Sequence, residues 1–177
     1  MLKLLASFVL ILYTTFVATH SQVVQPNVPK RIHNTCLETS HYDECLKYLT
    51  DDPKSSTADV HGLALIMVNV MKSKANVGVE KINQLIGSSS PDQNVALKSC
   101  ADKYNAIIAV NIPQATESLQ KKSSKLAMDS ALNASDVVSD CEDGFSGKSP
   151  LTTENLVMDR VSAITAQICR QLVLGGQ

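Results

Sequence analysis

The spacing of apolar residues after position 55 constrains the fold of this chain more than any other feature. Apolar residues recur every three or four positions in four long segments, and no alternating strand pattern of useful length competes with them. The predicted helices cover residues 57–86, 90–119 and 124–145, and a fourth begins near Thr152 or Thr153 and carries its apolar stripe to Leu172. Four helices joined by short turns pack as antiparallel neighbours, so the sequence predicts an all-α fold, an up-and-down four-helix bundle.

Capping signals predict where these helices begin. Ser56 or Thr57 is expected to cap the first helix. The second opens with Ser90-Pro91-Asp92-Gln93, which supplies a cap, a proline at the first helical position and the glutamine of a capping box. Pro113 interrupts the second helix, and because the apolar stripe resumes in phase we expect a kink rather than an end.

The N-terminal residues have the pattern of a secretory signal peptide. Lys3 precedes an apolar stretch over residues 4–18, and small residues at 19–21 suit cleavage before Gln22. The stretch is shorter than the roughly 18–20 apolar residues that span a membrane. We therefore expect residues 1–21 to be removed and the mature protein to be secreted without a membrane anchor. Its expected location is the apoplast or cell wall, with the vacuole as the alternative.

The segment between the signal peptide and the bundle is different in kind. Pro26, Pro29 and Pro53 bracket two helical segments, each too short to be stable alone. The predicted organisation is therefore a signal peptide at 1–21, a helical hairpin extension at 22–55 and a bundle domain at 56–177.

Five cysteines follow the signal peptide, and an exported chain matures where disulfides form. Cys100 and Cys141 lie at equal distances from the turn expected near residues 120–123, so an antiparallel hairpin places them opposite each other. Cys36 and Cys45 are then expected to form a local bond, and Cys169 remains as a buried free thiol. The loop-entropy description gives about 3 kcal/mol for the shorter loop and about 4 kcal/mol for the longer one.

Charge and composition exclude several classes of function. The chain carries 16 Lys and Arg against 17 Asp and Glu, a balance that gives no field suited to nucleic acid. Aromatic residues make up only 4%, few for a site that stacks on sugar rings. No phosphate loop, Gly-x-Ser-x-Gly elbow or His-Glu-x-x-His motif occurs. We expect no enzyme activity, no cofactor and no nucleic-acid partner.

Polar clusters elsewhere favour solvated surface over chemistry. His33 and His41, with Asp43 and Glu44, are the one candidate metal set, but solvated side chains beside a disulfide are the favoured interpretation, as for His61. Asp51-Asp52 before a proline is favoured as a turn. We predict no metal site.

Three lysines, Lys121, Lys122 and Lys125, surround the turn between the second and third helices. An exposed polar loop is the interpretation that the sequence alone favours, and a cationic knob for an acidic cleft is the functional alternative. The sequon Asn133-Ala134-Ser135 is a candidate glycosylation site inside a predicted helix.

Taken together, the residues resemble a known family. The spacing Cys36-x8-Cys45, the helix with Ser56-Thr57-Ala58-Asp59 followed by residues 62–68, and two later cysteines about forty apart are similar to the plant invertase and pectin methylesterase inhibitors. The resemblance implies a four-helix bundle, an N-terminal helical hairpin and the same two disulfides.

Residues 63–68 and 72–76, together with Cys141-Glu142 and Phe145, look closest to the cell-wall and vacuolar inhibitors of β-fructofuranosidase. In that branch a Pro-Lys-Phe tripeptide after the second helix enters the active site of the invertase. Ser124-Lys125-Leu126 stands at the matching position, where the lysine is kept and the proline and aromatic ring are replaced.

The resulting hypothesis is a secreted inhibitor that occludes the active site of an acid invertase through Ser124, Lys125 and Leu126. The same fold allows two alternatives: a pectin methylesterase inhibitor that binds through its helix faces, or a non-inhibitory, allergen-like wall protein. In the first two cases the partner is the target enzyme.

Overall fold

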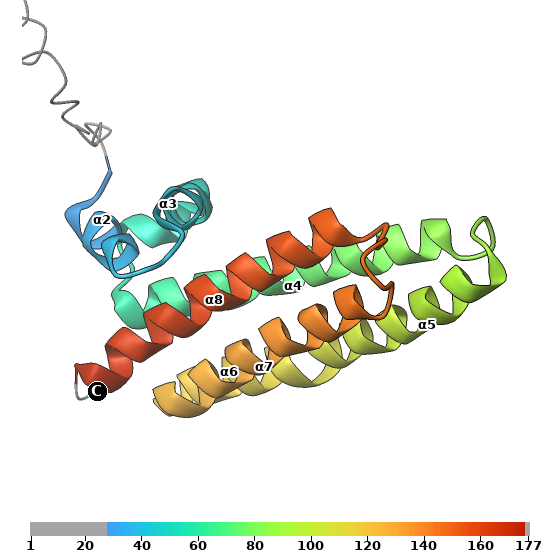
Figure 1. The fold of residues 1–177 in the computed structure, drawn as a ribbon. Coiled ribbons are helices and arrows are strands. Elements are labelled where there is room, and N and C mark those ends of the chain that lie inside the picture. The colour runs from blue at the N-terminus through green and yellow to red at the C-terminus, as the bar shows by residue number, and fades with distance from the viewer. Residues whose placement is uncertain (1–27, 176–177) are drawn as a thin grey trace, which may run out of the picture.

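We describe the chain from a computed structural model, which defines residues 28–175. The predicted signal peptide at 1–21 lies outside these residues. Within the described part every regular element is a helix, as predicted (Figure 1). The helices form an elongated bundle with a small helical hairpin at one end.

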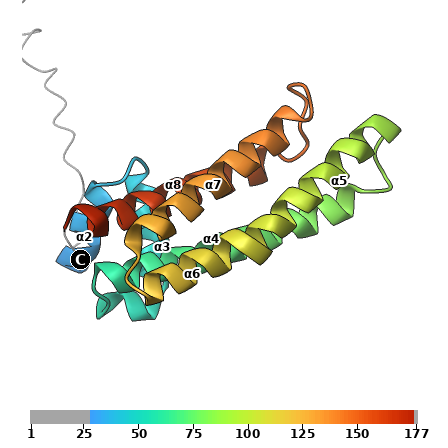
Figure 2. The same ribbon diagram turned by 90° about the horizontal axis from the view of Figure 1, so that it is seen from below.

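Four long rods make the bundle and run alternately up and down. The first is α4 (Val60–Leu85), and the second is built from α5 (Pro91–Ala106), the π-helical η2 (Ile107–Asn111) and α6 (Ile112–Gln120). The third and fourth are α7 (Ser124–Asp143) and α8 (Thr152–Leu174). Figure 2 shows α5 and α6 continuing one another along α4. The predicted up-and-down order is therefore confirmed.

The first rod begins later than the sequence analysis predicted. Neither Ser56 nor Thr57 caps it, because Pro53–Ser56 already forms a short 3-10 turn, η1. Asp59 is the cap: its carboxylate accepts a hydrogen bond of 2.7 Å from the backbone N–H of Gly62. A carboxylate at this end also interacts favourably with the helix dipole.

The second rod has the predicted capping box and, as predicted, does not end at Pro113. Ser90 and Gln93 form the capping box. The rod passes Pro113 without ending, since η2 lies directly before α6 and the N–H of Ile112 donates to the carbonyl of Ile107, five residues back. The wider π turn accommodates a residue that has no N–H to donate.

The N-terminal hairpin consists of α2 (Lys30–Leu37) and α3 (Tyr42–Asp51), joined by the Cys36–Cys45 disulfide. It lies against the ends of α4 and α8 (Figure 1). The second predicted disulfide, Cys100–Cys141, is also present and links α5 to α7. Cys169 is a buried free thiol, and burial raises its pKa to about 12.

A polar chain crosses the core at the far end of the bundle. The hydroxyl of Tyr104 on α5 donates to Asn155 Oδ1 on α8 (2.9 Å), and Asn155 Nδ2 donates to Glu142 Oε2 on α7 (2.7 Å). Thr152 Oγ1 donates to the other oxygen of Glu142 (2.5 Å). The side chains of Tyr104, Asn155 and Glu142 therefore all have partners in this chain of hydrogen bonds, and three rods are held in register.

Candidate functional site

The turn between α6 and α7 is a well-defined Schellman motif. The N–H of Ser123 donates to the carbonyl of Ser118 (2.8 Å), and the N–H of Lys122 donates to that of Leu119 (2.9 Å). Lys122 occupies the position that requires a left-handed backbone, with φ at 58°. The two backbone bonds hold the turn in one conformation at the end of the bundle.

A buried asparagine further along the same two rods fixes η2 against α7. Asn111, only 5% exposed, lies in the π-helical segment. Its amide donates to the carbonyl of Ser130 (3.1 Å) and to Oδ1 of Asn133 (2.8 Å). Asn111 was not among the predicted site residues. Only Pro113, two residues later, signalled that the helix is irregular here.

The three residues at the predicted target-binding position differ in exposure. Ser124 is the first residue of α7 and is buried at 4%. The Lys125 side chain is 73% exposed, and Leu126 is 46% exposed. Only Lys125 and Leu126 therefore present much side chain to a partner, while Ser124 belongs to the packed base of the turn.

A shallow groove of about 450 Å³ opens beside these residues. It brings the turn together with the last turn of α8, through Val173. Its lining residues are Lys122, Ser123, Ser124, Lys125, Leu126, Asp129 and Val173. Asp129 and Val173 were not among the residues predicted for this site. For Asp129 the four-residue spacing from Lys125 is a usable signal, whereas the approach of α8 follows only from the tertiary fold.

Two of the three lysines at the turn are neutralised within their own helices. Lys121 Nζ contacts Glu117 Oε1 at 2.5 Å, and Lys125 Nζ contacts Asp129 Oδ2 at 2.7 Å. The hydrogen bond and charge of Lys121 lower the pKa of Glu117. Exposed pairs of this spacing contribute only about 0.3–0.5 kcal/mol, so a partner can break them. Lys122 is exposed and has no ion-pair partner in residues 28–175.

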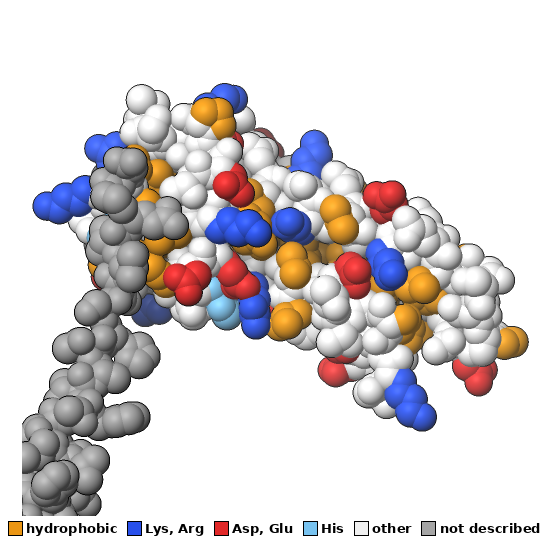
Figure 3. Space-filling view, turned by 90° about the horizontal axis from the view of Figure 1, so that it is seen from above, with side chains coloured by type: hydrophobic (Ala, Val, Ile, Leu, Met, Phe, Trp, Pro, Cys, Tyr) orange, Lys and Arg blue, Asp and Glu red, His pale blue; other side chains and the backbone are white. Residues whose placement is uncertain are grey.

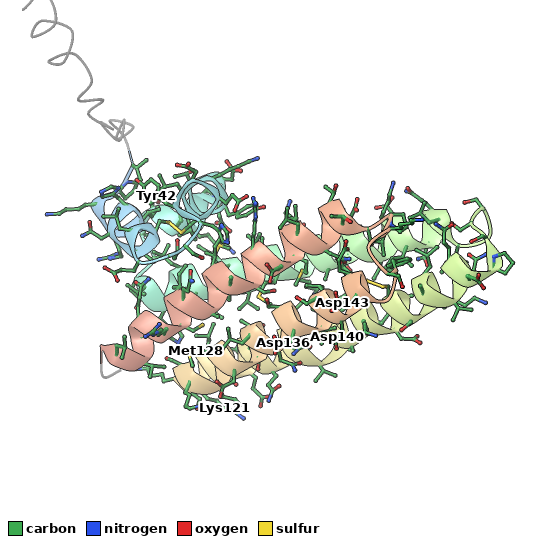
Figure 4. All side chains as sticks on the ribbon, in the orientation of Figure 1. Tyr42, Lys121, Met128, Asp136, Asp140 and Asp143 are labelled. Atoms are coloured by element: carbon green, nitrogen blue, oxygen red, sulfur yellow. A yellow bond between two sulfur atoms is a disulfide. The ribbon has the colours of Figure 1, made fainter. Side chains whose placement is uncertain are left out.

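Charges on the rest of the surface are mixed. Figure 3 shows basic and acidic side chains interspersed over one face of the bundle. Figure 4 places Lys121 at the turn end, with Asp136, Asp140 and Asp143 further along α7. The lysines of the turn are thus separated from the acidic residues towards the other end of α7.

The three histidines of the described chain have local structural partners. His33 hydrogen-bonds the hydroxyl of Tyr42 (2.7 Å), and His61 Nε2 donates to the carbonyl of Leu119 (2.6 Å). His41 Nδ1 lies 3.6 Å from Glu44 Oε2. Among residues 28–175, no three His, Cys, Asp or Glu side chains are grouped to hold a metal ion. Likewise, no helix in this range has the length and apolar character needed to cross a membrane.

The sequon lies in the middle of α7, as predicted. Asn133 is exposed, but its side-chain oxygen accepts the bond from Asn111. Ser135 Oγ donates to a carboxylate oxygen of Asp159 on α8. Both polar side chains of the sequon therefore take part in contacts between rods. Glycosylation at Asn133 stays a prediction.

The fold and its disulfides together define a class of protein: helical bundles that are cross-linked by one disulfide between rods and one within an N-terminal helical hairpin. Residues 30–172 match the family described as "Plant invertase/pectin methylesterase inhibitor", and the chain belongs to this family. The resemblance seen in the sequence is thereby confirmed.

Individual relatives come from both branches of the family. The chain is 35% identical over 137 residues to the "Cell wall / vacuolar inhibitor of fructosidase 1" of Arabidopsis thaliana, covering 77% of this chain and 66% of that protein. It is 30% identical over 140 residues to the "Cell wall / vacuolar inhibitor of fructosidase 2", covering 78% and 77%. It is also 32% identical over 90 residues to "Pectinesterase inhibitor 28" of Oryza sativa subsp. japonica, covering 46% and 40%.

A solved structure has the same fold. A mutant form of a pectin methylesterase inhibitor from Arabidopsis superposes with a TM-score of 0.68 at 22% sequence identity. The match covers 79% of this chain and 95% of that one. At this identity the likeness establishes the helical bundle and nothing about the target.

Proposed function

We propose that this protein is a secreted inhibitor of an acid invertase and that residues 121–126 occlude the enzyme's active site. The observation that carries the proposal is the rigid, cationic turn between α6 and α7, with an apolar residue and a groove beside it. Two relatives named as inhibitors of fructosidase support the choice of target.

The chemistry of the target favours this arrangement. Glycosidases of the usual type place a pair of carboxylates at the bond they cleave. A lysine ammonium that enters such a cleft pairs with those carboxylates, while Leu126 offers apolar area for the surrounding wall. Inhibitor complexes of this kind typically bury about 1,600 Å² in total, so helix surfaces flanking the turn also contribute contact.

The proposed setting is the apoplast or cell wall. It is supported by the signal-peptide pattern of residues 1–21 and by the names of the two fructosidase inhibitors. The two disulfides suit an oxidising compartment. The vacuole remains the alternative destination.

The test is inhibition of one purified plant acid invertase and one pectin methylesterase at mildly acidic pH. We expect the mature protein to inhibit the invertase alone. Lys125→Glu should abolish that inhibition, since it places a second acid beside Asp129 at the mouth of an acidic cleft. Inhibition of the invertase that survives Lys125→Glu would show that residues 124–126 do not form the contact.

Pectin methylesterase is the second candidate target, because a solved inhibitor of that enzyme shares this fold. In that case the binding surface is a helix face of the bundle rather than the turn, and Lys125→Glu leaves inhibition unchanged. Inactivity against both enzymes supports a non-inhibitory wall protein of the same fold.

A further inference from the structure

The three lysines of the turn are not equivalent, although the sequence presents them as one basic cluster. Lys121 and Lys125 each lie four residues from an acid on their own helix and contact it at 2.5 Å and 2.7 Å. Lys122 stands between them with its charge uncompensated by any ion pair in the described part of the chain. The net positive charge that the turn offers to a partner is therefore concentrated at Lys122.

The backbone at Lys122 gives a second, independent reason to look at this residue. Its φ of 58° is the left-handed conformation that closes the Schellman motif. Glycine, which has no Cβ, is the usual residue there. Asparagine is tolerated because its short polar side chain can hydrogen-bond locally, whereas most other side chains are strained in this region. Folding alone thus disfavours lysine at this position, and non-glycine residues held in such conformations concentrate at functional sites.

The pairing of Lys125 has a consequence for binding. A target carboxylate can displace Asp129 from Lys125, but the Asp129 carboxylate stays on the next turn of α7 and lines the same groove. The Asp129 carboxylate therefore approaches the acidic cleft of the target together with Lys125, and the two negative charges repel each other. The net attraction through Lys125 is smaller than its exposed ammonium suggests.

We propose that Lys122 is the main charge-bearing determinant of target recognition, and that Asp129 limits the contribution of Lys125. The inference rests on the proposed function and deepens it. The partner group is a carboxylate of the target's active-site cleft, which the ammonium of Lys122 meets before any internal pair has to be broken. Leu126 and Val173 supply the apolar side of the same contact.

The experiment measures inhibition of a plant acid invertase by the mature protein and a set of charge variants, at low and at moderate salt. Lys122→Asn removes the charge and keeps a residue that accepts the left-handed backbone. Lys122→Arg keeps the charge. Lys125→Gln and Asp129→Asn test the internal pair. Lys98→Gln, an exposed lysine on α5 without an ion pair in the described residues, is the control.

We expect Lys122→Asn to weaken inhibition about tenfold and to reduce its dependence on salt, as loss of an interfacial charge does. Lys122→Arg should stay close to the wild-type protein. Lys125→Gln should cost about threefold or less, and Asp129→Asn should strengthen inhibition about twofold, since it removes a charge worth little in its own pair. Lys98→Gln should have no effect.

Inhibition that Lys122→Asn leaves unchanged, or a loss at Lys125→Gln larger than that at Lys122→Asn, overturns the inference while the proposed function stands. A decrease in inhibition with Asp129→Asn overturns the part assigned to Asp129. Absence of inhibition by the wild-type protein overturns the proposed function and this inference together.

Discussion

Close approach of α4 and α5 depends on a single glycine. Gly78 of α4 faces the ring of Tyr104, and a Cβ built on Gly78 lies 2.1 Å from Cε1 of that ring. Tyr104 is fully buried and its hydroxyl is bonded to Asn155, so the ring cannot simply swing away. The absent side chain at position 78 therefore sets the distance between the first two rods.

Gly78→Ala is expected to destabilise the protein by about 1–3 kcal/mol through overpacking. This direction is opposite to the gain of about 1 kcal/mol that the same change gives at an exposed helical site. Urea unfolding monitored by circular dichroism measures the difference. Asn76→Ala, an exposed position two residues earlier, serves as the control and should be neutral or slightly stabilising. Equal stability of the two variants would contradict the packing argument.

The sequence did not reveal this glycine, nor the cap at Asp59, and the two failures share a cause. Helical periodicity reports which residues face inwards, but not which inward positions touch a large ring on another rod. In the same way, Ser56 and Thr57 have the chemistry of caps. A 3-10 turn at residues 53–56, which periodicity does not register, displaced the helix start to Val60.

At the scale of elements, the rods are joined by polar groups as well as by apolar packing. Glu142 on α7 accepts hydrogen bonds from Thr152 and Asn155 of α8. Burial raises the pKa of Glu142, but hydrogen bonds from Thr152, Asn155 and Ser149 outweigh it, and the net pKa lies below the ordinary 4.5. The charged form of Glu142 is thus the one that the folded bundle stabilises.

A carboxyl whose pKa is lower when folded contributes stability that is present above its unfolded pKa and is lost as pH falls through its folded pKa. Glu142→Gln should therefore lower the melting temperature at pH 7, and the difference from the wild-type protein should shrink once the pH falls below 4.5. Thermal unfolding at a series of pH values down to about 3 follows this change.

Glu80→Gln on the exposed face of α4 controls for the loss of a negative charge, and its effect should be small at every pH. If the melting temperature of Glu142→Gln stays as far below that of the wild-type protein in acid as at pH 7, the cause is a poor fit of the amide in the site and not the loss of the charge of Glu142.

Elements were predictable where the chain repeats a simple pattern, and the site was predictable only in part. The four rods, the capping box at Ser90 and the facing cysteines follow from spacing and turn chemistry. The location of the lysines at a helix–helix turn follows as well. The division of charge among them depends on the side-chain contacts with Glu117 and Asp129, and the participation of Val173 depends on where α8 ends.

At the scale of the whole molecule, the hairpin and the bundle each contain one disulfide. The hairpin is attached to α8 by a few polar contacts: Arg160 to Glu44 (2.6 Å), Ser40 to Gln167 (2.8 Å) and Gln171 to the carbonyl of Thr35 (2.9 Å). Ile32 and Leu49 of the hairpin are buried in the same apolar core as the bundle, but most of that core lies between the four rods. We therefore expect the hairpin to open locally without unfolding the bundle.

The buried thiol of Cys169 reports whether the bundle itself opens or only the hairpin does, since α8 must leave the core before a reagent reaches this thiol. Cys100→Ser with Cys141→Ser removes a bond between residues 41 apart and about 4 kcal/mol of loop entropy. Labelling of Cys169 through global unfolding should then accelerate about a thousandfold, since each 1.36 kcal/mol is tenfold. Cys36→Ser with Cys45→Ser should accelerate this labelling less than about tenfold, because the lost stability falls on the hairpin.

Labelling followed by mass spectrometry, with Cys169→Ser as the blank, measures both rates. Equal acceleration by the two pairs would mean that hairpin and bundle unfold as a single cooperative unit.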